Sequence, residues 1–224
     1  MDLNLRSSVR TDQLREKFRY GTLLLFWPIF GLLFLYLERM REVPDYYEMH
    51  CALDDFIPFN EWFIIPYMFW FVYLIGMISY TFFKEKDVFV QLMKYLIATN
   101  MAAVVIFFVF PTVQNLRPDV FPRDNALTRF IGAFYRFDTD TNVCPSLHVV
   151  DSLAVLSAAL RSRRFGQSRP WRFAFRVACM LICISTVFLK QHSAIDLVVG
   201  AFVGAIAEHM VYGSAAAQQH TARV

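Results

Sequence analysis

Long runs of apolar residues, separated by short charged segments, are the feature of this sequence that most restricts its fold. A helix that crosses a bilayer needs about 20 mostly apolar residues. The fourth run is short, about 22 Å long as a helix, and contains Asp151. The sequence therefore predicts an all-α, six-helix transmembrane bundle, with spans at Tyr20–Leu37, Trp62–Phe83, Val88–Phe110, Ser146–Leu160, Phe173–Leu189 and Ile195–Tyr212.

The composition supports a membrane protein and excludes several other classes. Hydrophobic residues make up 57% of the 224 residues and charged residues 18%, whereas soluble domains carry about 25% charged residues. The formal net charge of +3 is small, which argues against a nucleic-acid-binding protein. Four cysteines do not form a disulfide framework, although Cys51 and Cys144 both fall in predicted outer loops and could pair.

Basic residues are distributed between the loops as the positive-inside rule expects. The segments that we place inside contain 15 Lys and Arg residues, and those outside contain 7. The outer loop 38–61 also contains seven acidic residues. We therefore expect both termini to be cytosolic, with loops 38–61, 111–142 and 190–194 outside.

The chain divides into a cytosolic segment 1–19, one membrane domain 20–212 and a disordered cytosolic tail 213–224. The first apolar run is followed by charged residues without a small-residue cleavage site, so we expect it to remain in the protein. We predict a multi-pass protein of the plasma membrane.

Two of the five histidines stand apart from the others. His148 and His192 each lie at the outer start of a predicted helix, so the topology places both at the same membrane depth. His50 lies in the acidic outer loop, His209 at the inner end of the last helix and His220 in the tail. We interpret these three as solvated or interfacial.

The residues around the two histidines predict reactive chemistry. His192 and Asp196 are four residues apart, so they share a helix face. An aspartate bound to one ring nitrogen leaves the other nitrogen as a nucleophile or base. Pro145 suits a first helical turn, and Ser146 with the adjacent N–H groups forms an anion-binding helix start where His148 can donate a proton. The alternative is two interfacial histidines, a capping serine and a snorkelling aspartate.

Two further polar residues are candidates for the site. Arg117 follows the third span at the depth of the histidines, and a guanidinium is well shaped to bind phosphate. Asp151 lies three residues after His148 and one turn deeper, where an acid is costly and functional by default. It could orient His148 or bind an acceptor hydroxyl, or it could form a helix–helix hydrogen bond.

Three segments resemble the signature of the type 2 phosphatidic acid phosphatase superfamily. That signature is Lys-x6-Arg-Pro, then Pro-Ser-Gly-His, then Ser-Arg-x5-His-x3-Asp. The matching segments occur in the same order and at the expected helix ends: Arg117-Pro118, Pro145-Ser146-Leu147-His148, and Ser185 followed by His192 and Asp196. The predicted six-helix layout resembles the same superfamily.

The resemblance implies phosphoryl transfer to and from a histidine, without a metal or another cofactor. His192 would be the nucleophile, held by Asp196, and His148 would protonate the leaving oxygen and later activate the acceptor. The substrate would be a lipid phosphate whose chains stay in the bilayer. The charge of the transition state would be stabilised by the phosphate-binding residues Arg117, Lys190 and Ser146.

Lys190 is assigned because the sequence departs from the signature. Phe110 replaces the motif lysine, Leu147 the glycine and Thr186 the arginine. Lys190 would share a helix face with Thr186 if that helix continued far enough, and so could supply the displaced charge. This variant looks most like the inositol phosphorylceramide synthase branch, whose members are phospho-headgroup transferases, so the acceptor is either water or an alcohol.

Other functions fit the sequence less well. The sequence contains no Gly-x-Ser-x-Gly segment, which an intramembrane serine protease would use, and no paired-histidine helix motif, which would support a metal hydrolase. A small transporter with a proton relay would need charged groups along a path through the bilayer. The candidate groups instead gather at the outer interface, so we favour a lipid phosphatase, with the phosphotransferase as the alternative.

Overall fold

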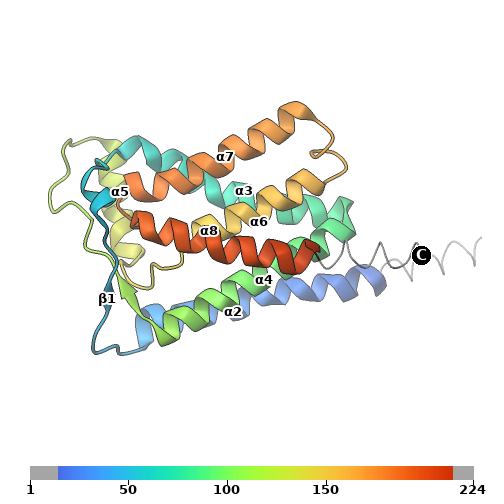
Figure 1. Cartoon of the computed structure of the whole chain (residues 1–224), viewed down its shortest axis with the longest axis horizontal. Coiled ribbons are helices and arrows are strands. Elements are labelled where there is room, and N and C mark those ends of the chain that lie inside the picture. Colours follow the sequence, from blue (N-terminus) through green and yellow to red (C-terminus); the bar gives the residue numbers. More distant parts are fainter. Residues whose placement is uncertain (1–14, 214–224) are drawn as a thin grey trace, which may run out of the picture.

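The computed structural model describes residues 15–213, which form a bundle of long helices that run back and forth along one direction (Figure 1). The parts of the predicted terminal segments at 1–14 and 214–224 lie outside the described residues. Among the described residues, five helical segments are long and apolar enough to cross a membrane: Arg15–Met40, Glu61–Lys84, Lys86–Val109, Arg169–Phe188 and Ala194–Gly213. The prediction of a helical, multi-pass membrane protein is confirmed.

The helices follow the predicted apolar runs closely. The first segment has a 3-10 turn (Thr22–Leu25) and a π-helical turn (Tyr36–Met40) on either side of its α-helix. Two parallel strands of two residues each, β1 (Tyr47–Glu48) and β2 (Thr112–Val113), join two loops at one end of the bundle. The α-helices are α2 (Phe26–Leu35), α3 (Ile64–Lys84), α4 (Lys86–Val109), α5 (Ala126–Phe137), α6 (Leu147–Arg161), α7 (Arg169–Phe188) and α8 (Ala194–Glu208).

The fourth predicted run forms α6, which is the central helix of the bundle. Its 15 residues are fewer than those of the five long segments. It packs against α3, α4, α7 and α8, and small side chains such as Ala154, Ala158 and Ala159 are fully or almost fully buried. Because the four neighbouring helices cover α6, its polar side chains face protein.

Two glycines allow α8 to approach α6 closely. A Cβ atom at Gly200 would lie 3.1 Å from Cβ of Val149 and 3.2 Å from the backbone oxygen of Ser146. At Gly204 it would lie 2.9 Å from Leu153 Cδ1. Small residues four apart let the backbones of two membrane helices come together. This contact sets the distance between the starts of α6 and α8.

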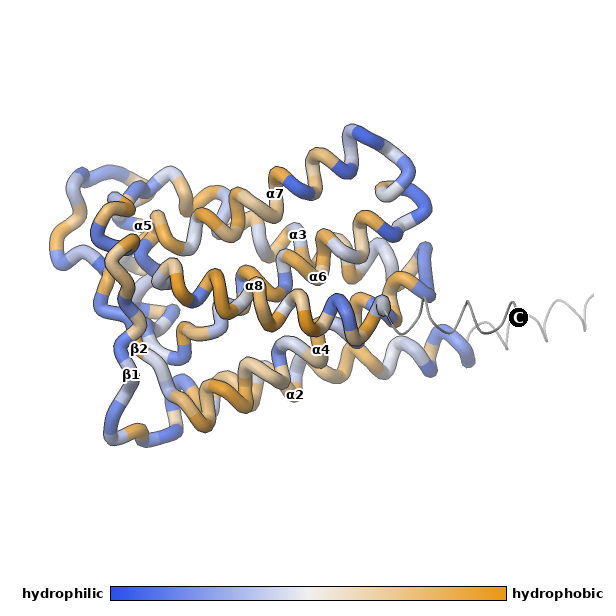
Figure 2. The backbone as a smooth tube through the Cα atoms, viewed as in Figure 1, coloured by the Kyte–Doolittle hydropathy of each residue, from blue (hydrophilic) through white to orange (hydrophobic). Residues whose placement is uncertain are grey.

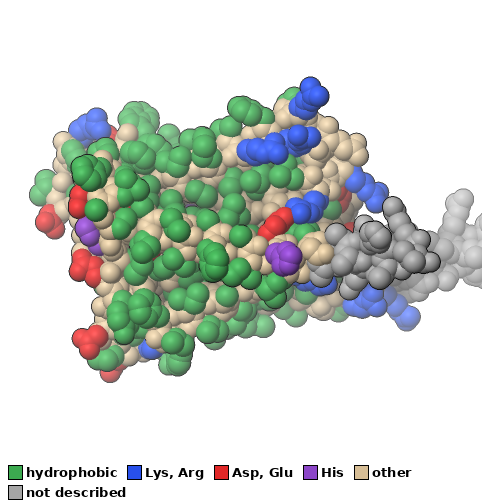
Figure 3. All heavy atoms as spheres, viewed as in Figure 1, with side chains coloured by type: hydrophobic (Ala, Val, Ile, Leu, Met, Phe, Trp, Pro, Cys, Tyr) green, Lys and Arg blue, Asp and Glu red, His purple; other side chains and the backbone are tan. Residues whose placement is uncertain are grey.

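The sides of the bundle expose large apolar side chains, while charged residues gather at its ends. Phe69, Val72, Val198 and Phe202 are all exposed, and the tube in Figure 2 is largely apolar between its two ends. In Figure 3, Asp and Glu gather at the end with the long loops, and most Lys and Arg lie at the opposite end. An apolar belt between charged ends suits a helical bundle surrounded by hydrocarbon.

Helix α5 was not predicted, since the segment 111–142 was treated as a loop. Its N-terminus is capped by Asn125, whose side-chain oxygen accepts hydrogen bonds from the N–H groups of Leu127 and Thr128. A capping residue before an amphipathic stretch is the signal that could have revealed it. Ile131 on its buried face packs with Ile64 and the other members of a hydrophobic cluster, so α5 covers the end of the bundle that carries the long loops.

Candidate active site

The loop between α7 and α8 carries His192 and is shaped by helix caps at both ends. After α7 ends, Lys190 adopts a φ of 55°, and the N–H groups of Lys190 and Gln191 donate to the carbonyls of Val187 and Thr186. This is the bonding of a Schellman motif, with a lysine where glycine is usual. Ser193 then caps α8. The caps hold His192 between two helix ends.

His192 and Asp196 form the predicted pair. Their side chains approach to 3.3 Å between Nδ1 of His192 and Oδ2 of Asp196, and the same carboxylate oxygen accepts the N–H of Ser193 at 2.9 Å. Asp196 is fully buried and His192 is 8% exposed. With Nδ1 bound to a fixed carboxylate, Nε2 of His192 is available to a substrate.

His148 lies next to His192, so the structure brings the two predicted histidines together. The ring centroids are 6.1 Å apart. The His148 ring also contacts two aromatic side chains of α3, with centroid distances of 4.2 Å to Tyr67 and 4.6 Å to Trp70. Its Nε2 is buried and has no hydrogen-bond partner among the described residues. An unpartnered ring nitrogen beside a second histidine is suited to proton transfer.

Arg117 is near the site, but its guanidinium is held by protein oxygens. Nε and Nη2 donate to Oε1 of Gln191 at 3.0 and 2.6 Å. The backbone oxygens of Tyr135, Asp138 and Thr139 accept the remaining hydrogen bonds at 2.7 to 3.1 Å. Arg117 therefore fixes Gln191, the residue before His192.

Lys190 is oriented differently from the expectation. The idea that it shares a helix face with Thr186 is wrong, because α7 ends at Phe188 and Lys190 has a positive φ. Its ammonium group donates to the backbone oxygen of Asp54 at 2.8 Å. Burial lowers the pKa of Lys190, and the nearby acids Asp54 and Asp55 oppose this.

Asp54, which the sequence analysis did not single out, binds the loop that carries His192. Its carboxylate is 2% exposed and accepts hydrogen bonds from the Ser193 hydroxyl and from the N–H groups of Ala194 and Cys51. Burial favours the neutral acid, but these hydrogen bonds outweigh it and lower the pKa of Asp54. No sequence spacing indicates this contact.

Ser146 and Asp151 both lie on or next to α6. Ser146 precedes the helix, is fully buried, and donates its N–H to the backbone oxygen of Asp196 at 3.3 Å. Its hydroxyl has no partner among the described residues. Asp151 accepts a hydrogen bond from Asn100 of α4 at 2.7 Å, which is the helix–helix alternative considered for this residue. Cys51 and Cys144 are free thiols.

A cavity of about 270 Å³ opens beside the two histidines. His148, His192 and Gln191 line it, together with the two acids Glu38 and Asp138. Its described lining residues include neither Arg117 nor Lys190. Asp138 accepts hydrogen bonds from Gln191 and Tyr67 at 3.0 and 3.3 Å. Burial raises the pKa of Asp138, and the Arg117 guanidinium opposes part of this rise.

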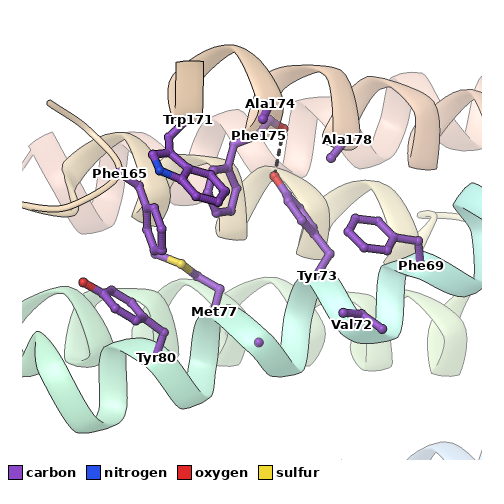
Figure 4. A pocket seen from close by; sticks show the side chains of 11 residues that line it. Phe69, Val72, Tyr73, Met77, Tyr80, Phe165, Trp171, Ala174, Phe175 and Ala178 are labelled. Carbon is purple, nitrogen blue, oxygen red and sulfur yellow. Dashed lines mark hydrogen bonds between the residues drawn. The ribbon is translucent and has the colours of Figure 1, made fainter. Parts of the chain in front are cut away.

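A second hollow lies between α3 and α7, away from the histidines. Tyr73, Met77, Trp171 and Phe175 are among its lining residues (Figure 4), and the Tyr73 hydroxyl donates to the backbone oxygen of Phe175 at 3.0 Å. None of its described lining residues is a histidine or a carboxylate. The candidate chemistry is therefore confined to the first cavity.

The histidines, Asp196 and the loop between α7 and α8 all fall within a region that matches a known family. The family model described as the PAP2 superfamily matches residues 91–219, which is more than half of the chain. The chain belongs to the PAP2 superfamily. Members of the PAP2 superfamily are usually phosphatases or phosphotransferases, and they include lipid phosphatases. No curated protein and no solved structure matches the chain.

The PAP2 match begins near the start of α4, so several residues around the cavity lie outside it. Glu38, Tyr67 and Trp70 all precede residue 91 and come from the first half of the chain. The family match covers both histidines, and the first two long helical segments contribute part of the cavity lining.

Proposed function

We propose that this protein is a membrane-embedded lipid phosphatase that hydrolyses a phosphate ester or pyrophosphate of a lipid through a phosphohistidine. The observation that carries the proposal is the approach of His148 to the Asp196-bound His192 at one end of a cavity. The superfamily, which includes lipid phosphatases, supports the reaction class.

In the first half-reaction, Nε2 of His192 attacks phosphorus while the bond from phosphorus to the leaving oxygen breaks. His148, as the general acid, gives its proton to that oxygen. Asp196 keeps the His192 ring in the reactive orientation and stabilises its positive charge. The buried start of α6, with Ser146, contributes N–H groups that favour the phosphate charge.

In the second half-reaction, His148 acts as the base. It takes a proton from water, the water oxygen attacks phosphorus, and the bond between phosphorus and His192 breaks. Phosphate leaves and both histidines return to their starting states. If an alcohol replaces water, the same steps make the protein a phospho-headgroup transferase.

The cavity also supports a lipid as the substrate. Its wall includes the apolar residues Phe30, Phe34 and Leu147 in addition to the histidines. A lipid could therefore keep its chains in the bilayer while its phosphate reaches His192. We propose a bundle of six spans that includes α6, with both termini cytosolic and the histidines at the extracytoplasmic side of the plasma membrane. The separation of basic and acidic ends supports this orientation.

Direct binding of the phosphate by Arg117 and Lys190 remains a prediction. Each would have to exchange its protein oxygens for phosphate oxygens when substrate binds. From the hydrogen bonds that they make, we infer that both position the His192 loop: Arg117 through Gln191, and Lys190 through Asp54.

The test is a rapid-quench experiment on the purified full chain with phosphatidate labelled on its phosphate. We expect acid-labile, alkali-stable label on the wild-type protein, and neither label nor turnover in His192→Ala. His148→Ala should slow both half-reactions by about 10²- to 10⁴-fold. His50→Ala is the matched control, because His50 lies in the outer loop and binds the exposed Asp55.

Unchanged turnover in His192→Ala would overturn the proposal. So would a folded wild-type protein that neither releases phosphate from phosphatidate, a polyprenyl pyrophosphate or a lysophosphatidate nor releases a phospho-headgroup from a phosphodiester lipid. Parallel reactions with a diacylglycerol or ceramide acceptor distinguish the transferase, because label would then move to the acceptor and not appear as free phosphate.

A further inference from the structure

The cavity beside the histidines is lined by aromatic rings on several sides. The rings come from three elements, the first helical segment, α3 and α5, and they include Phe30, Tyr67, Trp70, Phe71, Phe134 and Phe137. Tyr67 and Trp70 also contact His148 directly. The aromatic wall is therefore continuous with the reacting histidines. Aromatic faces attract cations, and quaternary ammonium groups are commonly bound in such cages.

The same cavity contains two carboxylates and no Lys or Arg among its described lining residues. Glu38 accepts hydrogen bonds from the Asn142 amide at 2.7 Å and the Thr141 hydroxyl at 3.4 Å. Asp138 is bound by Gln191 and Tyr67. Within residues 15–213, neither acid forms an ion pair with a Lys or Arg. Both side chains are half-buried, and acids withdrawn from water are normally paired, so both carboxylates have unused capacity for a cation.

The two carboxylates make this cavity less favourable for a doubly charged phosphate monoester than for a zwitterionic headgroup. A dianion at the histidines would face two carboxylates, and like charges in a poorly solvated cavity repel. A zwitterionic headgroup avoids this conflict, because its ammonium can lie near the carboxylates while its phosphate lies at the histidines. The cavity of about 270 Å³ corresponds to roughly nine water volumes, which is room for a small headgroup.

A polyol headgroup uses only part of this site. Its hydroxyls could donate to Glu38 and Asp138, but a neutral ring gains no charge attraction from the surrounding aromatic faces. Acids and aromatic faces together favour a cation.

We propose that this cavity binds the ammonium group of a zwitterionic phospholipid, of the choline or ethanolamine type, and so presents its phosphodiester to His148 and His192. His192 takes the phospho-headgroup as the bond from phosphorus to the diacylglycerol oxygen breaks, and that oxygen receives the His148 proton. Water then releases phosphocholine or phosphoethanolamine from His192. This inference rests on the proposed function and names its substrate class. Glu38 and Asp138 provide the negative charge that attracts the ammonium, and the aromatic side chains of α3 and α5 surround it.

Binding can be measured separately from turnover in His192→Ala protein, by titration calorimetry in detergent. The probes are dihexanoyl phosphatidylcholine, phosphatidylethanolamine, phosphatidate and phosphatidylinositol, each below its micelle concentration. We expect one of the zwitterionic lipids to bind at least about tenfold more tightly than the other two classes. Free choline and phosphocholine form a separate arm, and we expect both to bind more weakly than the lipid because they lack chains.

Glu38→Gln tests the charge, because it keeps the shape of the side chain and one acceptor oxygen for the Asn142 amide. It should weaken binding of the zwitterionic lipid by about tenfold and leave phosphatidate binding unchanged or tighter. Glu42→Gln is the matched control, since Glu42 is an exposed acid of the same loop and does not line the cavity. Phe137→Leu is a second variant that should fold, because Phe137 is 77% exposed. It should weaken binding about threefold.

Binding of phosphatidate or phosphatidylinositol that is tighter than binding of the zwitterionic lipids would overturn this inference. So would equal binding of the zwitterionic lipid to His192→Ala protein with and without Glu38→Gln. Binding of free choline as tight as that of the lipid would identify a soluble ligand and overturn the lipid assignment. Phosphohistidine formation from phosphatidate tests only the proposed function. The two proposals can therefore fail independently.

Discussion

The carboxylate of Asp54 accepts a hydrogen bond from the backbone N–H of Ala194 at 2.8 Å, across a separation of 140 residues. The Ser193 hydroxyl donates to the same carboxylate, and Lys190 donates to the Asp54 backbone oxygen. Three residues that flank His192 are thus attached to one residue of the segment that precedes α3. Asp54 holds the loop without contacting either histidine.

Replacing Asp54 should therefore affect stability and rate together. Asp54→Ala leaves buried donors at Ser193 and Ala194 without a partner, at a cost of about 1–3 kcal/mol for each group. We expect a melting temperature several degrees lower in detergent and a kcat reduced by at least about tenfold, since small displacements of reacting groups are costly. Asp55→Ala is the control, because Asp55 is exposed. Equal effects of the two substitutions would contradict this role.

The same carboxylate predicts a pH dependence of stability. Hydrogen bonds lower the pKa of Asp54 below its ordinary value of 3.8. Its contribution is therefore fully present above about pH 4 and is lost as the pH falls through the folded-state pKa. Melting temperatures measured between pH 3 and pH 6 should fall more steeply toward low pH for the wild-type protein than for Asp54→Asn. Parallel curves would contradict the prediction.

Substitutions of Lys190 distinguish a direct phosphate contact from a structural role. Because its ammonium binds Asp54, we expect Lys190→Met to lower the melting temperature while reducing kcat/KM by less than about threefold. A loss of about two orders of magnitude, as for a removed transition-state contact, would instead support direct phosphate binding. Lys190→Gly is the matched variant, since glycine suits the positive φ and should recover part of the lost stability.

Gly200 should tolerate no added side chain. A Cβ atom there meets Cβ of Val149 and the Ser146 oxygen at 3.1 and 3.2 Å, and neither is the free end of a flexible side chain. Gly200→Ala should move α6 away from α8 and lower kcat by about tenfold. Gly31→Ala is the control, because nothing lies within 4 Å of its added Cβ. It should be neutral or stabilising by up to about 1 kcal/mol. Equal activity of the two variants would refute the packing argument.

Chelators should leave turnover intact, because the proposed mechanism uses His192 as the nucleophile and the N–H groups at the start of α6 for the phosphate charge, and needs no metal ion. The measurement is the initial rate with and without EDTA, on protein purified in its absence. A loss of activity that a divalent ion restores would favour the metal-hydrolase alternative.

The helical framework and the histidine pair could be predicted from the sequence because both depend on local spacing. A bilayer requires apolar runs of nearly constant length, so the long helical segments coincide with such runs. His192 and Asp196 are four residues apart at a helix start, and the spacing alone brings their side chains together. His148 was placed near them only through topology, and the 6.1 Å between the rings agrees with that reasoning.

The remaining parts of the site depend on contacts between distant segments. The end of α7 turned Lys190 toward Asp54, because a Schellman cap and not a further helical turn follows Phe188. Asn100 paired with Asp151 because α4 and α6 are neighbours. Glu38 and Asp138 are 100 residues apart, and they reach one cavity because the end of the first helical segment binds the segment that follows α5, as in the hydrogen bond from Asn142 to Glu38. Local spacing determined which groups can react, whereas tertiary packing decided which charges surround them.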